Sequence, residues 1–115
     1  MNTKINKLLY EWGVPPHLLG FTYLKDAVKL ISENPKNLRQ ITKVLYPAIA
    51  KANDTTASRV ERAIRHAIGV ALNNMGAVEF RKRFGRTLGS NGSVPNSMFI
   101  AALVNYYEFM EDTNG

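Results

Sequence analysis

Three charged residues, Arg59, Glu61 and Arg62, lie close together in a stretch whose apolar residues recur with helical spacing. The planar guanidinium of an arginine can donate two hydrogen bonds to O6 and N7 of guanine. A glutamate can accept one from the N4 amine of cytosine, whereas it would be of no use on a surface that bound only phosphates. The combination favours recognition of base edges in the major groove of duplex DNA.

A helix over about residues 56–74 is expected to carry this cluster. On a helical wheel its apolar residues gather on one face, which predicts the packed side: Val60, Ile64, Ala67, Ile68, Ala71, Leu72 and Met75. The opposite face holds Ser58, Arg62, Arg65, His66, Gly69 and Asn73. Because this outer face has no packing purpose, we expect it to contact DNA; the alternative is an ordinary amphipathic helix with a solvated basic face.

The preceding segment has the properties of the first helix of a helix-turn-helix. Its apolar stripe predicts one helix over Asn37–Ala52, with a kink or local break near Tyr46, because Pro47 removes a backbone donor. Residues 53–55 form the expected turn, and Thr55 or Thr56 can cap the next helix. In such a motif the second helix enters the major groove and the first crosses the DNA backbone.

The rest of the chain also shows helical spacing. We expect helices over Lys4–Trp12, over His17–Ile31 with a start shifted toward Gly20, over Ala77–Phe84, and from Pro95 or Asn96 onward. A loop rich in Gly, Ser and Asn covers residues 85–95, and no stretch alternates long enough to predict a strand. The fold class expected is all-α, with about six helices and a central helix-turn-helix.

Composition limits the kind of protein. With 115 residues, 45% of them hydrophobic, the chain is long enough for one globular domain, and we expect residues 1–115 to form it. There is no cysteine and no cluster of metal ligands or catalytic groups, so we expect no cofactor, no metal and no enzymatic activity. No apolar run approaches the roughly 18 residues that span a bilayer, so we expect no membrane contact and a cytoplasmic location.

Charge is distributed unevenly along the chain. The formal net charge is +6, and residues 39–86 contain ten basic side chains against three acidic ones, while the C-terminal end is acidic. A basic middle segment indicates a polyanionic partner, although a merely soluble basic surface is the alternative. Within that segment, Lys51, Thr56, Ser58, Arg65, His66 and Arg83 are the candidates for contacts with the DNA backbone.

Several short sequence segments resemble those of a known protein family. They are ITKVLYP from Ile41, TTASRVERAIRHAI from Thr55, GVPPH from Gly13, GFTYLKDA from Gly20, and PNSxFIA from Pro95. In these segments the chain resembles the C-terminal effector domain of stage zero sporulation protein A, a bacterial response regulator that controls entry into sporulation. The resemblance spans nearly the whole chain.

The resemblance implies specific binding to short promoter boxes, activation or repression of transcription, and contact with an RNA polymerase sigma factor. It also implies that Arg59, Glu61 and Arg62 contact bases, with Ser58, Arg65 and His66 on the same DNA-facing surface. A bacterial, nucleoid-associated protein is therefore expected. Aromatic residues of the last helix could pair two copies on tandem boxes, or could equally belong to the core.

Three features depart from the family pattern. The N-terminal receiver domain typical of the family is not present in these residues, which are either a fragment or a stand-alone protein. The segment Arg81–Arg86 is more basic than expected, and Gly69 replaces a larger polar residue. The missing receiver leaves a second hypothesis open, in which the chain binds sigma factor or a full-length regulator without DNA.

Overall fold

A computed structural model of the chain describes residues 3–84 and 94–114. Its elements, in order, are α1 (Thr3–Glu11), α2 (Leu19–Glu33), a 3₁₀-helix η1 (Pro35–Arg39), a π-helix η2 (Ile41–Leu45), α3 (Tyr46–Ala52), α4 (Ala57–Asn74), α5 (Ala77–Phe84) and α6 (Asn96–Asn114). The described ranges contain no strand, so the all-α prediction is confirmed. None of the described helices is long and apolar enough to cross a membrane.

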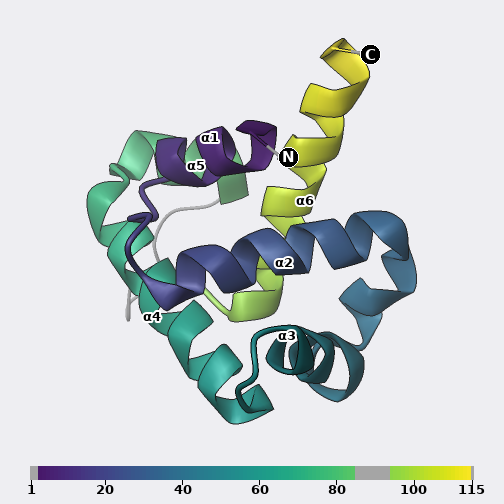
Figure 1. Cartoon of the computed structure of the whole chain (residues 1–115). Helices are drawn as coiled ribbons and strands as arrows, with labels where there is room; N and C mark the ends of the chain where they lie inside the picture. The colour runs from purple at the N-terminus through teal and green to yellow at the C-terminus, as the bar shows by residue number, and fades with distance from the viewer. Residues whose placement is uncertain (1–2, 85–93, 115) are drawn as a thin grey trace.

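Helix α2 lies across the middle of the molecule and packs on α4 and α6 (Figure 1). At Gly20 the two helices lie close together, because a Cβ atom there would overlap the backbone oxygen of Ala63 and lie 2.5 Å from Cβ of Ala67. Only glycine allows the two backbones to come so near without displacing one of them. Gly20 thus sets the position of α4, the predicted recognition helix, against the rest of the fold.

The core is continuous and draws on every α-helix. Val60, Ile64 and Ala67 of the predicted inner face of α4 are buried, as are Phe99 and Leu103 of α6. Around Trp12, the rings of Phe99, Tyr106 and Phe84 stack edge-on with centroids 5.4, 5.3 and 6.1 Å away. Each large apolar side chain buried in this way contributes roughly 1.5–3 kcal/mol, so the core fixes the helix-turn-helix against the other helices.

The prediction of one continuous helix over Asn37–Ala52 was wrong at its start. The side chain of Asn34 accepts a hydrogen bond from the Lys36 backbone N–H at 3.2 Å, which caps the separate 3₁₀-helix η1. Gln40 then leaves helical geometry (φ −130°, ψ 54°), and the helical path resumes at Ile41. The local dihedral break is therefore at Gln40, before the expected first helix of the motif begins.

The predicted distortion near Tyr46 is confirmed. The Leu45 N–H donates to the Gln40 carbonyl, five residues back, at 3.1 Å, so one wide π-turn precedes α3. Pro47 occupies the first turn of α3. A proline is tolerated at this point because an N–H there has no obligatory α-helical partner. Helix α2 begins at Leu19, near Gly20, and the predicted loop at 85–95 lies largely outside the described residues.

Candidate nucleic-acid interface

The turn between α3 and α4 is fixed by side-chain contacts. Asn53 donates its side-chain amide to the Asp26 carboxylate on α2 and to the Ile49 carbonyl, both at 2.8 Å. Asp54 adopts a left-handed conformation with φ 54°, which reverses the chain. The Thr56 hydroxyl then accepts from the Arg59 N–H at 3.3 Å and caps α4, as predicted.

The first turns of α4 present the predicted base-contacting residues to solvent. Arg59 and Arg62 are exposed, and neither side chain has an ion-pair or hydrogen-bond partner among the described residues. His66 is exposed on the same side of the helix, four residues beyond Arg62. Charged donors that are already paired would have to break those contacts first, whereas Arg59 and Arg62 are free to bind a ligand.

Glu61 lies beside these arginines but is engaged with Arg65. The two side chains form an i,i+4 ion pair and are 42% and 61% exposed. An exposed pair of this kind contributes only about 0–1 kcal/mol, so it can open when a better partner arrives. The pair therefore orients the Glu61 carboxylate only weakly.

The remaining predicted backbone contacts lie on adjoining turns. Lys51 is exposed in the last turn of α3, and Ser58 is exposed in the first turn of α4 with its hydroxyl 3.5 Å from that of Thr56. Figure 1 shows α3 beside the N-terminal end of α4. The structure thus places the predicted DNA-facing residues of α3 and α4 around one end of the helix-turn-helix.

Arg83 is placed elsewhere. Its guanidinium carbon lies 4.9 Å from the ring centroid of Trp12 and 5.6 Å from that of Tyr106, and it pairs with Glu79. Only 17% of its side chain is exposed. Helix α5 follows the C-terminal end of α4, so Arg83 is separated from Arg59 by most of the length of α4. Its contacts within the protein give it a structural role that the sequence did not suggest.

Asn96 of α6 contacts both helices of the helix-turn-helix, which sequence reasoning missed. Its amide donates to the Tyr46 hydroxyl at 3.0 Å and to the Glu61 backbone oxygen at 3.3 Å. Burial raises the pKa of Tyr46, although the Asn96 hydrogen bond opposes this change. The sequence marked Asn96 only as a helix start; its partners are 50 and 35 residues away and no local pattern predicts them.

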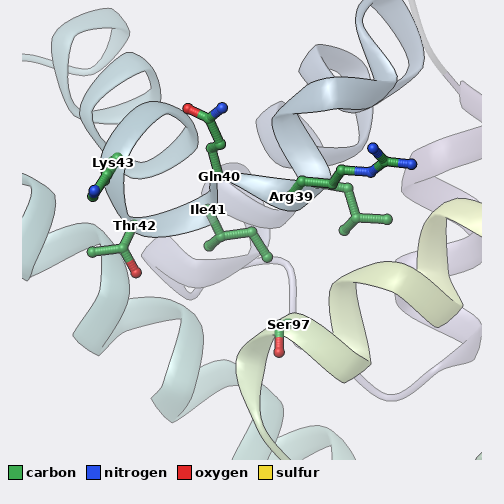
Figure 2. A pocket seen from close by; sticks show the side chains of 7 residues that line it. Arg39, Gln40, Ile41, Thr42, Lys43 and Ser97 are labelled. Atoms are coloured by element: carbon green, nitrogen blue, oxygen red, sulfur yellow. The ribbon is translucent and has the colours of Figure 1, made fainter.

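Two hollows that share lining residues lie between the η1–η2 segment and the start of α6, and the second of them reaches α4. The larger, of about 610 Å³, lies between the η1–η2 junction and the start of α6; Figure 2 shows its lining residues Leu38, Arg39, Gln40, Ile41, Thr42, Lys43 and Ser97. The second, of about 410 Å³, is lined by Ile41, Thr42, Tyr46, Glu61, Arg65, Val94, Pro95, Asn96 and Ser97. The described residues include no group of three or more His, Cys, Asp or Glu side chains suited to a metal.

A capped helix with free arginines on its outer face, following a short helix and a tight turn, defines a helix-turn-helix DNA-binding domain of the kind found in transcription regulators. The chain belongs to the family described as sporulation initiation factor Spo0A C terminal, whose model matches residues 5–107. The match covers nearly the whole chain and confirms the resemblance seen in its sequence segments. The family consists of DNA-binding domains of sporulation regulators and is not a catalytic family.

Proposed function

We propose that this chain binds short promoter boxes in duplex DNA sequence-specifically, and so activates or represses transcription. The observation that carries the proposal is the pair of free, exposed arginines, Arg59 and Arg62, beside Glu61 on the capped end of α4. In this arrangement the N-terminal half of α4 enters the major groove, and α3 crosses the DNA backbone.

The roles proposed for the side chains follow from their chemistry. Arg59 and Arg62 donate to guanine O6 and N7, and Glu61 leaves Arg65 to accept from a cytosine amine. Arg65, once released, contacts a phosphate. Lys51, Thr56, Ser58 and His66 supply further backbone contacts, which set the register of the helix but carry no sequence information.

Arg83 takes no part in the proposed DNA-facing surface. The proposal that it contacts a phosphate requires its guanidinium to leave Trp12, Tyr106 and Glu79, against which it is held at 17% exposure. A cation stacked on aromatic rings contributes about 0.5–2 kcal/mol, and its removal from them would cost that amount. We therefore assign Arg83 to stability.

Selection of bound duplexes from a randomised pool, followed by affinity measurements at one fixed salt concentration, tests the proposed function. A short common sequence should emerge, and duplexes that contain it should bind at least tenfold more tightly than scrambled duplexes of the same composition. Equal affinity for selected and scrambled duplexes would overturn the proposal of specific recognition.

The proposal extends to a second copy of the chain on tandem boxes. The observation that favours it is a pair of exposed aromatic side chains on α6, Tyr106 at 36% and Phe109 at 66%, around a hollow of about 310 Å³. Sedimentation on duplexes with one and two boxes would show cooperative loading of the second box if α6 pairs the copies. Contact with a sigma factor, and association with the chromosome in the cell, follow from the same proposal.

A further inference from the structure

We propose that the hollow at the η1–η2 junction is a second contact surface for the DNA sugar-phosphate backbone, in which Ser97 of α6 acts together with Arg39, Thr42 and Lys43. This inference rests on the proposed function, because it needs the recognition helix to lie in the major groove. It adds to the DNA-binding surface a helix, α6, that is remote from the helix-turn-helix in sequence.

The polar residues that line the hollow are cations and hydrogen-bond donors. Arg39 and Lys43 provide two cations, and Gln40, Thr42 and Ser97 provide neutral hydrogen-bond donors, while no carboxylate lines this hollow. All five residues are exposed, and none of their side chains has a partner among the described residues. A surface of unpaired cations and hydroxyls without an acid is suited to phosphodiester oxygens, which only accept hydrogen bonds.

The hollow adjoins the second hollow, which borders α4. It shares Ile41, Thr42 and Ser97 with the adjoining hollow, whose wall includes Glu61 and Arg65 of α4. A continuous concave path therefore leads from the flank of the recognition helix to Lys43. In Figure 2, Ser97 lies at the start of α6, opposite the η1–η2 segment that carries Ile41 and Thr42, with its hydroxyl directed away from that segment.

The width of the DNA major groove determines where the two sugar-phosphate strands lie relative to α4. A helix with its side chains is about 10–12 Å across and fills a major groove about 12 Å wide. The two sugar-phosphate strands must then run along the flanks of the helix. On the flank that bears Arg65, the surface next to α4 is this path, so the bordering strand passes over Thr42 and Ser97 toward Lys43.

A small-molecule site fits the hollow less well. Such sites enclose most of the ligand surface, whereas every polar residue that lines this hollow is exposed on the surface. A free phosphate or nucleotide would use the same donors as a DNA strand. The shared chemistry is a phosphate ester, and the two sources are separated by the experiment below.

The test is the salt dependence of binding to a selected duplex by the full chain and by R39Q, K43Q and the double variant. Removal of one phosphate contact should reduce the slope of log K against log salt by about 0.9, which corresponds to an affinity decrease of about fivefold at 0.15 M salt. The double variant should show a slope smaller by about 1.8 and an affinity about thirtyfold weaker. The preference for selected over scrambled duplex should stay unchanged, because phosphate contacts carry no sequence information.

K7Q is the matched control, since Lys7 is an exposed lysine on α1, away from both hollows. S97A should weaken binding without changing the slope, because a hydroxyl releases no counterion. If wild type prefers the selected duplex but R39Q and K43Q behave like K7Q, this inference is overturned while the proposed function stands. If wild type shows no preference at all, it is the proposed function that fails.

Titration of the protein with inorganic phosphate and with a mononucleotide, without DNA, distinguishes a site for a DNA strand from a site for a free phosphate or nucleotide. The inference expects no saturable NMR shift of Thr42, Lys43 or Ser97 below about ten millimolar ligand. Saturation in that range, together with an unchanged salt slope in the double variant, would assign the hollow to a small anion and overturn the inference.

Discussion

The side-chain amide of Asn96 lies 3.0 Å from the hydroxyl of Tyr46, and this contact joins the start of α6 to the start of α3. The same amide also donates to the Glu61 backbone oxygen at 3.3 Å. One residue near the C-terminal end of the fold therefore holds both helices of the helix-turn-helix. The orientation of α4 relative to α3 therefore depends on a contact outside the motif itself.

Replacement of Asn96 should show how much this contact contributes. N96A leaves the Tyr46 hydroxyl without its side-chain partner and removes a second hydrogen bond to the Glu61 carbonyl, and should lower the free energy of unfolding by about 1–3 kcal/mol. Y46F removes one of the two bonds and should cost less. Urea denaturation measures both, with the exposed Asn105 replaced by alanine as a control; an N96A variant as stable as N105A would contradict this role.

Two helical glycines should respond to alanine in opposite directions. G20A forces a Cβ against the Ala63 backbone and the Ala67 side chain, and overpacking of this kind costs about 1–3 kcal/mol or more. Around Gly69 there is nothing within 4 Å, so G69A should raise stability by up to about 1 kcal/mol. Thermal melts of the two variants provide the comparison. Equal shifts would show that Gly20 does not set the packing of α2 on α4.

A variant of Arg83 distinguishes a role in protein stability from a contact with a DNA phosphate. If its contacts with Trp12, Tyr106 and Glu79 are what matter, R83A should lower the melting temperature and leave affinity for DNA unchanged in the folded protein. A phosphate contact would instead weaken binding to every duplex alike and reduce the salt slope by about 0.9. R81A, at an exposed position of the same helix, is the matched control.

Because the pKa of Tyr46 is raised, the free energy of unfolding should fall at alkaline pH. An unfolded tyrosine loses its proton near its ordinary pKa of 10.0, whereas the buried hydroxyl keeps its proton to a higher pH. The folded state then binds more protons than the unfolded state, so this contribution to stability is full below pH 10 and falls as the pH rises above it, by at most about 1.4 kcal/mol per unit. Unfolding measured from pH 8 to 11 should show a steeper fall for wild type than for Y46F; parallel curves would exclude the effect.

Local patterns predicted much of this structure. The periodicity of Val60, Ile64 and Ala67 predicted the buried side of α4, and the hydroxyl of Thr56 predicted where that helix begins. Both predictions needed only neighbours within a few residues. The apolar periodicity and the polar turn predicted the helix-turn-helix, and the family match confirms the resemblance that agreed with it.

What local patterns could not predict depends on long-range packing or on competing local bonds. The break at Gln40 arises because Asn34 caps a separate turn, which overrides a helical apolar pattern. Arg83 appeared to be one more surface cation, because its aromatic partners Trp12 and Tyr106 are distant in sequence. Asn96 was missed for the same reason, as was the hollow between the η1–η2 junction and α6.

The central claim is that Arg62 recognises a base through the fork of its guanidinium. Its most direct test compares the affinity ratio of selected to base-substituted duplexes for wild type, R62A and R62K at one salt concentration. Without the bidentate contact, discrimination at one position should fall by about 1–3 kcal/mol, roughly 5- to 150-fold, in both variants. R62K keeps the charge and should retain the wild-type salt slope. If R62A keeps the wild-type preference at every position of the box, α4 does not recognise DNA through Arg62 and the account is contradicted.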